Sequence, residues 1–406
     1  MGDNTLSSRW AALGLFIAGD SAGRMAGQSI GVMLPLITKE LAITPLGAGW
    51  LGAAPWIGNL FFSIPFGWWL SRYSYRRLMA LYLFTAAGLV ALQGGAATFA
   101  ILLGAKIMES VTSVVRVPVR ALLLHRWFPK KELTWANGIS MGLAELASGL
   151  TVATAPFLFI LLGGWRNTFY LFSLAIMLVG ILWVALVKEG GPLLSPTTAV
   201  PERAPIAAVV RYKHLWVMGA CRFGSQFQWS AFTIFFPTYL LNTYQVPLTT
   251  SGFVVSLLYV GVVVAFLTCG FLLDKVGRTR PMIWIPGFAV PILSLAMLFT
   301  SWIPLLAFLS FMSGFTRIST PIIHTMPFQL PEIKPREIAV ASGLVMTMQT
   351  VGGIAGPLVA GVLYQTWGSL HLALALCFLS PLLIGFGGLI LPEMGPKASE
   401  RVSLEL

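Results

Sequence analysis

Twelve runs of apolar residues divide this chain and constrain its fold more than any other feature. An α-helix needs about 20 apolar residues to cross the roughly 30 Å hydrocarbon core of a bilayer, so each run predicts one transmembrane helix. Most breaks between the runs are short and contain Pro, Gly or charged residues. The predicted spans are 11–37, 46–70, 77–96, 99–125, 136–162, 166–187, 215–241, 250–273, 281–300, 303–328, 339–364 and 368–391.

The composition excludes a soluble protein. Hydrophobic residues make up 57% of the 406 residues and charged residues only 10%, against about 25% charged residues in ordinary globular proteins. A soluble domain with so few charges has too little polar surface to cover itself. The first run is too long for a cleavable signal peptide and carries Asp20 and Arg24, so we expect it to be retained as the first span.

One long non-apolar interruption, Lys188 to His214, separates the spans into two groups of six and contains four prolines. It predicts a linker between two compact halves. The expected fold is an all-α membrane protein with twelve transmembrane helices in two pseudo-symmetric bundles. The predicted domains are an N-terminal six-helix bundle at 1–187, a cytoplasmic linker at 188–214 and a C-terminal six-helix bundle at 215–406.

The positive charge of the chain, formally +12, follows the topology of the predicted spans. Lys and Arg are retained on the cytoplasmic side of a membrane. With the N-terminus inside, eighteen of them fall in cytoplasmic segments, and only Lys39 and Arg166 fall in outer loops. We therefore expect a multi-pass protein of the cell (inner) membrane with both termini cytoplasmic. The basic residues are a topology signal, so no nucleic-acid partner is expected.

The two halves repeat at an offset of 203 residues. Three glycine pairs recur at nine-residue intervals along the second and eighth spans, where small residues allow close helix contact, and a proline pair follows in the fourth and tenth spans. Four pairs at one offset favour duplication over coincidence. The pairs are Gly49 with Gly252, Gly58 with Gly261, Gly67 with Gly270, and Pro118 with Pro321.

The turn after the eighth span reads GxxxDKxGRxR, from Gly270 to Arg280. With two six-span halves and an inner linker, the chain resembles the major facilitator superfamily over nearly its whole length. In the first copy of the motif, Ser71 and Ser74 replace the usual Asp and Gly. The resemblance implies that this turn braces a cytoplasmic gate, formed here by Asp274, Arg278 and Arg72.

Nine charged residues lie inside the predicted spans. Each costs about 2.5–3.5 kcal/mol at mid-helix if it faces lipid, so these residues must face one another or water. Their surplus of positive charge predicts an anionic substrate. The bases are Arg24, Lys106, Arg116, Arg120, Arg222 and Arg317, and the acids are Asp20, Glu109 and Glu145.

Arg317 is the favoured substrate-binding cation, because it lies near mid-membrane with no acid in its own span and a guanidinium can hold a carboxylate by two hydrogen bonds. Several alternatives remain open: Asp20–Arg24 and Lys106–Glu109 could be internal pairs, Arg120 could snorkel, and Arg222 could serve the gate. The other predicted substrate-binding residues are Arg24, Arg116, Lys106, Arg222, Gln226 and Gln28.

Carboxylates in a dry cavity exchange protons near neutral pH, which predicts proton coupling. Glu145 is favoured because its helix carries no neighbouring base; alternatively, it pairs with Arg116 or Arg120. His324 could titrate during transport or be a structural histidine. The predicted proton-coupling residues are Glu145, Glu109, Asp20 and His324.

The turn after the fourth span, Arg126-Trp127-Phe128-Pro129 and onward, resembles the RWFPxxERxxAxG segment of the anion:cation symporter branch of the family. Leu133 replaces the second Arg of that segment. Lys106 and Pro118 keep the branch's twelve-residue spacing, but Ser113 replaces its Glu, and Glu109 is the nearest substitute. The resemblance implies organic or phosphate-like anions as substrates, often carried with protons.

The sequence therefore predicts a monomeric secondary active transporter that moves a small carboxylate-type anion by alternating access, coupled to protons. The alternatives are a monocarboxylate or anion exchanger, a proton-coupled exporter of drug-like or amphipathic compounds, a membrane sensor and a lipid flippase. No HExxH, GxSxG or P-loop motif indicates an enzyme. Scattered histidines and three unpaired cysteines indicate no metal site, and no cofactor is expected.

Overall fold

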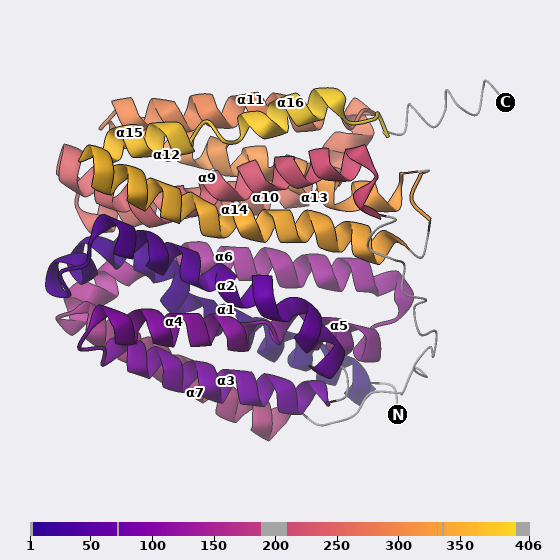
Figure 1. Ribbon diagram of the computed structural model, residues 1–406. Coiled ribbons are helices and arrows are strands. Elements are labelled where there is room, and N and C mark those ends of the chain that lie inside the picture. The colour runs from indigo at the N-terminus through magenta and orange to yellow at the C-terminus, as the bar shows by residue number, and fades with distance from the viewer. Residues whose placement is uncertain (1–2, 71–72, 188–208, 331, 335–336, 395–406) are drawn as a thin grey trace. The chain divides into compact units, whose positions relative to one another are not determined.

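The computed structural model of the protein describes residues 3–70, 73–187, 209–330, 332–334 and 337–394. Every regular element within these ranges is a helix (Figure 1). The helices before the predicted linker are α1 (Asp3–Glu40), α2 (Pro45–Leu70), α3 (Tyr75–Gly94), α4 (Phe99–Ser113), α5 (Arg116–Trp127), α6 (Lys130–Leu162) and α7 (Trp165–Leu186).

The helices after the predicted linker begin with α9 (Lys213–Tyr244). Short 3₁₀ turns, labelled η, interrupt several of them. The remaining elements are α10 (Leu248–Val276), α11 (Pro281–Ala296), η1 (Met297–Phe299), α12 (Ile303–Phe315), η2 (Thr316–Ile318), α13 (Ser319–Thr325), η3 (Met326–Phe328), α14 (Ile338–Trp367), α15 (Leu370–Cys377) and α16 (Leu382–Ile390).

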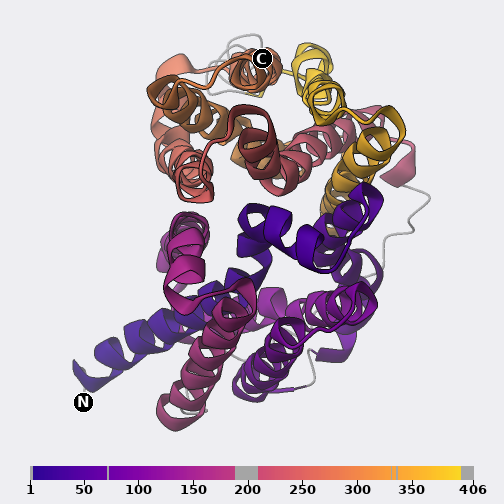
Figure 2. The same ribbon diagram turned by 90° about the vertical axis from the view of Figure 1, so that its left-hand side faces the viewer.

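Contacts divide the chain into two compact units. The first comprises Met1–Thr44 and Ala54–Thr198, and the second comprises Pro45–Ala53 and Ala199–Leu406. Within the first unit α3 packs along α7 and α1 along α6; within the second, α9 packs along α14 and α10 along α12. Figure 2 shows the helices of each unit closer to end-on. Most of the predicted linker, residues 188–208, lies outside the described residues, so the predicted domain boundaries stay a prediction.

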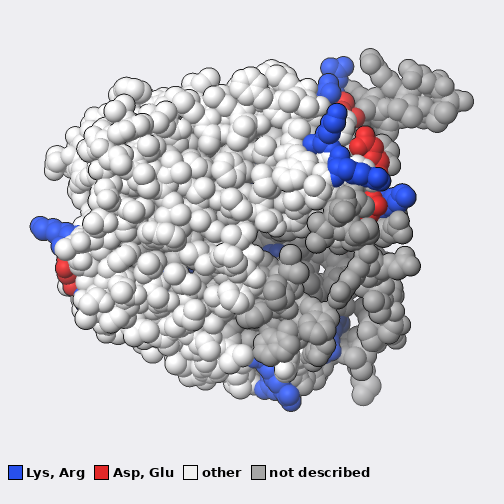
Figure 3. Space-filling model, viewed as in Figure 1, with Lys and Arg blue, Asp and Glu red and all other residues white. Residues whose placement is uncertain are grey.

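Each predicted span coincides with one helix or with consecutive helical segments. In the described residues, eight spans are long and apolar enough to cross a membrane by length and composition. The other four correspond to α1, α2, α4 with α5, and α9. The break in the fourth span leaves α4 and α5 each too short to cross a membrane alone, and buried charged residues lower the hydropathy of α1 and α9. On the face shown in Figure 3, charged side chains gather near the helix ends, and mostly uncharged residues form the zone between.

The fourth span is broken at one level. Pro118 has no N–H to donate and its ring would clash with the carbonyl of Val114, four residues earlier. The chain leaves the α-helix at Val114 and Val115, whose N–H groups bond to carbonyls three residues back at 3.4 and 3.3 Å. A new helix, α5, starts at Arg116, two residues before the proline.

The tenth span is broken at the equivalent level. Pro321 lies four residues after Arg317, the 3₁₀ turn η2 covers Thr316–Ile318, and α13 starts at Ser319, two residues before the proline. The repeated prolines therefore interrupt both spans at corresponding positions, 203 residues apart.

A repeated glycine pair also has the same packing role in each unit. A Cβ at Gly58 would lie 2.4 Å from the Ser110 backbone, and one at Gly261 would lie 2.2 Å from the Phe311 carbonyl oxygen. Both glycines therefore allow the second span of their half to touch the backbone of the fourth. The Ser110 hydroxyl adds a hydrogen bond from the Gly58 N–H at 2.8 Å.

Candidate functional site

A buried carboxylate, Asp20, organises the charged residues of the first unit. Its oxygens accept hydrogen bonds from Nη2 of Arg24, one turn along α1, and from Nη1 of Arg116 at the start of α5, both at 3.0 Å. The side chain of Asp20 is only 6% exposed. The helix break before Pro118 places Arg116 opposite Asp20, and the Arg116 Nε also donates to the Ser113 carbonyl at 3.1 Å.

Arg24 lies between two carboxylates. Its Nη1 lies 3.6 Å from Oε1 of Glu145 on α6, and the side chains of both residues are 27% exposed. The sequence-based alternative paired Glu145 with Arg116 or Arg120; the structure instead pairs it with Arg24, which lies on the neighbouring helix α1. Arg120, one turn beyond Arg116, lies within electrostatic range of Asp20.

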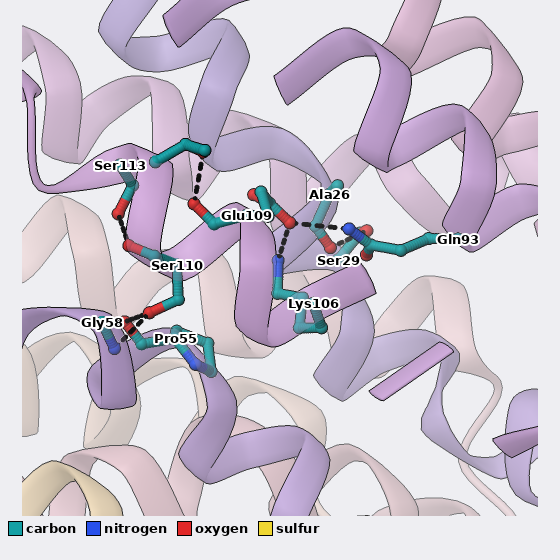
Figure 4. Close-up of polar contacts among 10 residues, drawn as sticks. Ala26, Ser29, Pro55, Gly58, Gln93, Lys106, Glu109, Ser110 and Ser113 are labelled. Carbon is teal, nitrogen blue, oxygen red and sulfur yellow. Dashed lines mark hydrogen bonds and ion pairs between the residues drawn. The ribbon is translucent and has the colours of Figure 1, made fainter. Parts of the chain in front are cut away.

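A second buried group joins α3 to α4 (Figure 4). The Lys106 ammonium donates to Oε2 of Glu109 at 2.6 Å, and the Gln93 amide donates to the same oxygen at 2.8 Å. Lys106 and Glu109 are 3% and 7% exposed, so this is the internal pair that the sequence left as an alternative. A Cβ at Gly27 would lie 3.1 Å from the Lys106 nitrogen, so Gly27 makes room for the ammonium.

The second unit has a different charge pattern, centred on Arg222 of α9. Arg222 is 2% exposed. Its Nη1 donates to the Thr320 hydroxyl at 2.8 Å and its Nε to the Gln349 carbonyl oxygen at 3.3 Å. Among the described residues, no carboxylate lies within 4.0 Å of this guanidinium, and the hydrogen bonds at its Nη1 and Nε both go to neutral side chains.

Gln349 of α14 links Arg222 to two other predicted site residues. Its Oε1 also lies 3.3 Å from Nε2 of His324, and its Nε2 lies 3.5 Å from Oε1 of Gln226. These separations exceed the usual 2.9–3.0 Å, so the bonds are weak. The buried guanidinium is thus held by neutral groups that an anion could displace.

Arg317 lies in the 3₁₀ turn η2 and is partly buried. Its Nη2 donates to the Ser225 carbonyl at 3.0 Å, and its Cζ lies 3.8 Å from the centroid of the Trp229 ring. Tyr259 packs against the same indole edge-to-face, with centroids 5.2 Å apart. Ser225 and Trp229 follow Arg222 along α9, so Arg222 and Arg317 belong to one cluster.

The two units therefore differ in their balance of buried charge. The spans of the first unit contain four of the bases and all three acids, whereas those of the second contain Arg222 and Arg317 and no acid. Arg222 is buried with neutral hydrogen-bond partners, and a buried charge without a counter-charge costs several kcal/mol. The second unit can recover this free energy by binding an anion.

The remaining predicted residues lie near the end of α10, on α1 or outside the described residues. Asp274 and Arg278 are exposed at the end of α10 and in the turn after it, and Arg72 lies outside the described residues. Gln28 is partly buried on α1, two turns beyond Asp20. No group of three or more His, Cys, Asp or Glu side chains placed to hold a metal ion occurs among the described residues.

Sequence reasoning missed four residues of these clusters: Gln93, Thr320, Gln349 and Trp229. Each is uncharged and lies on a different helix from the charge it contacts, so helical periodicity carries no signal for the pairing. Trp229 resembles the other aromatic residues of an apolar helix. Its spacing of one turn from Ser225 and two from Arg222 was the only available hint.

Comparison with known proteins identifies the family. The family model described as Major Facilitator Superfamily matches residues 13–329, with a second match at 218–405. The chain belongs to this superfamily. It is a multi-pass membrane transporter and not an enzyme.

Related proteins are anion transporters by name. A nitrite extrusion protein of Bacillus subtilis is 24% identical over 355 residues, covering 86% of this chain and 85% of the relative. A probable nitrate transporter, NarT, of Staphylococcus epidermidis is 26% identical over 87% of this chain and 88% of its own length. A D-galactonate transporter of Escherichia coli is 24% identical over 82% of this chain and 84% of its own length. The resemblance to the anion:cation symporter branch is confirmed.

Solved structures confirm the fold. A bacterial homologue of the human lysosomal transporter Spinster superposes with a TM-score of 0.75, covering 94% of each chain at 14% identity. The nucleoside transporter NupG gives the same TM-score, covering 93% of this chain and 98% of its own, at 13% identity. The predicted twelve-helix arrangement with two pseudo-symmetric halves is therefore correct.

Proposed function

We propose that this protein is a secondary active transporter of a small anion that carries a carboxylate or another planar oxyanion group. The observation that carries the proposal is Arg222, a fully buried guanidinium with no carboxylate in reach among the described residues and only neutral hydrogen-bond partners. Transporters named for nitrate and for D-galactonate match most of the chain, and both of these anions present coplanar oxygens. A guanidinium binds such a group by two parallel hydrogen bonds.

We further propose that a proton accompanies the anion and that Glu145 carries it. Of the two carboxylates that face Arg24, Glu145 is the more exposed and the more distant, at 3.6 Å against 3.0 Å for Asp20. It is therefore the acid that a proton reaches most readily. Asp20 is held by both Arg24 and Arg116 and stays ionised.

Protonation of Glu145 changes the net charge of the ionised residues around it. With every group ionised, the cluster of Asp20, Glu145, Arg24, Arg116 and Arg120 has one surplus positive charge. A proton on Glu145 raises the surplus to two and releases one side of the Arg24 guanidinium. A monovalent anion that enters with the proton leaves the total charge of the loaded protein unchanged, so proton and anion are carried together at little electrostatic cost.

Thermal unfolding of the purified protein tests the anion, since a bound ligand raises apparent stability. Nitrate, acetate and D-galactonate should raise the unfolding temperature, whereas choline and tetraethylammonium should not. Arg222→Gln should weaken anion binding about 10-fold or more, the loss of a charge-assisted hydrogen bond. Arg222→Lys should retain only part of the wild-type affinity for the anion, because an ammonium cannot form the bidentate contact.

Arg211→Gln is the matched control, because Arg211 is exposed and stacks over Tyr212. It should bind anions as the wild type does. Stabilisation by cations and by none of the anions would refute the proposal.

Uptake into proteoliposomes with an imposed pH gradient tests the proton. Glu145→Gln, which imitates the protonated acid, should lose stimulation by the gradient and keep anion exchange. Glu132→Gln serves as the control, since Glu132 pairs with Arg9 at 3.2 Å, away from these clusters. Gradient-driven uptake by Glu145→Gln at the wild-type level would remove Glu145 from the coupling. The asymmetry of Lys and Arg supports a cell-membrane orientation with both termini cytoplasmic.

A further inference from the structure

Two contacts, one with an aromatic ring and one with a backbone carbonyl, hold the guanidinium of Arg317 in a fixed plane. Its Cζ lies 3.8 Å from the Trp229 ring centroid, which is the separation of stacked planes in van der Waals contact. Its Nη2 donates to a backbone carbonyl, that of Ser225, at 3.0 Å. The guanidinium therefore lies flat on the indole, with its rotation about the stacking axis fixed by the Ser225 bond.

The indole is itself immobilised. Tyr259, on α10, is 1% exposed and meets Trp229 edge-to-face at 5.2 Å and 78°. Trp229 and Ser225 are one turn apart on α9, so the stack and the hydrogen bond come from the same rigid segment. The plane of Arg317 is thus set by two neighbouring helices of the second unit.

A guanidinium with one face covered by an aromatic ring can be reached in two ways, from its open face or along its edge. The N–H groups all point outward in the guanidinium plane, so hydrogen-bonded anions approach along the edge. A nitrate or carboxylate group that accepts two parallel N–H bonds lies in the same plane. Part of the bound anion lies beside the Trp229 indole. An anion oxygen that lay out of the guanidinium plane, on the side of the indole, would come closer to the ring than van der Waals contact allows.

We propose that Trp229 is a positioning and specificity-determining residue for anion transport. By fixing the plane of Arg317 it favours ligands with two coplanar oxygens, such as nitrate and carboxylates, over spherical chloride and tetrahedral sulfate. This inference rests on the proposed function and deepens it by naming the shape of the group that is recognised. Trp229 does not itself need to bond the anion, because its effect passes through Arg317.

Isothermal titration of the purified, full-length protein with sodium nitrate, acetate, chloride and sulfate tests the proposal. The wild type should bind nitrate and acetate more tightly than chloride and sulfate. Trp229→Leu, which keeps an apolar side chain and removes the aromatic face, should weaken nitrate and acetate binding about 10-fold. It should leave chloride and sulfate nearly unchanged, so the preference for planar anions falls. Trp229→Phe keeps an aromatic face and should restore most of that preference.

Trp216→Leu is the matched control: Trp216 is on the same helix, 43% exposed, and donates only to the Val210 carbonyl. It should keep the wild-type ratio of affinities. If Trp229→Leu does not fold, Tyr259→Leu, which removes the ring that supports the indole, carries the same expectation. A wild-type protein that binds none of the four anions would refute the proposed function. Anion binding with an unchanged planar preference in Trp229→Leu or Tyr259→Leu would refute the role of Trp229 alone.

Discussion

Replacing Asp20 by Asn should destabilise the protein more than removing any exposed charge. The substitution keeps the shape of the side chain and removes its charge, so it creates no cavity. Asp20 accepts from two guanidinium groups at 3.0 Å each and is 6% exposed. At an effective dielectric constant of about 20, each unit-charge pair about 4 Å apart is worth about 4 kcal/mol. The substitution also removes the free-energy penalty of burying an ionised carboxylate, which offsets part of the lost attraction.

The free energy of unfolding should fall by about 3–5 kcal/mol, the usual cost of removing one partner of a buried ion pair. Arg24 and Arg116 would then face each other, and among the described residues Glu145, at 3.6 Å, would be the acid that still pairs with Arg24. This partner places the expected loss at the lower end of the range. With about 2–4 °C per kcal/mol for a unit of this size, the apparent unfolding temperature should fall by roughly 10 °C.

Intrinsic tryptophan fluorescence at one fixed heating rate is the suitable assay, because membrane proteins in detergent often unfold irreversibly. Adding Arg116→Gln to Asp20→Asn should cost less than Arg116→Gln costs in the wild type, because the two residues interact directly. An Asp20→Asn protein that unfolds within 2 °C of the wild type, a margin of about 1 kcal/mol, would refute the reasoning.

Two further predictions concern other contacts of the first unit. A Cβ at Gly23 would lie 1.8 Å from the Tyr82 hydroxyl oxygen, whereas one at Gly88 would meet open space; thermal unfolding should show a loss of about 1–3 kcal/mol for Gly23→Ala and none for Gly88→Ala. Glu40 is the last residue of α1. Hydrogen bonds from Arg166 and Trp165 lower its pKa below the ordinary value of 4.5. The stability that Glu40 adds should be complete above that value and lost as the pH falls through the lowered pKa. Because Glu40 is 46% exposed, Glu40→Gln should cost at most about 1 kcal/mol at neutral pH, and equal unfolding temperatures of both proteins across this range would contradict the role of Glu40.

The fold and the local ion pairs could be predicted from the sequence because both depend on near neighbours in the chain. Apolar runs define the spans, and spacings of four and three residues place Arg24 beside Asp20 and Glu109 beside Lys106. The duplication was visible because Pro118 and Pro321 have the same 203-residue offset as the three glycine pairs. The structure shows that each proline follows a break in its span. The break before each of them decides where Arg116 and Arg317 lie.

The pairing between helices could not be predicted. Arg116 donates a hydrogen bond to Asp20, which lies 96 residues earlier in the chain. Glu145 pairs with Arg24 and not with Arg116 or Arg120. Such contacts depend on helix rotation and tilt, which hydropathy does not fix. Neutral partners such as Gln349 and Trp229 carry no charge that would mark them in an apolar helix, although they decide how Arg222 and Arg317 are presented.

The interruptions before Pro118 and Pro321 give each unit a joint at the level of one of its buried or partly buried arginines. A helix that lacks ladder hydrogen bonds at one level bends there more readily than elsewhere. Arg317 lies within the joint of its unit and Arg116 directly after the joint of its own. A small change of angle at either joint would reorient the guanidinium of Arg116 or Arg317 while the surrounding helices keep their packing.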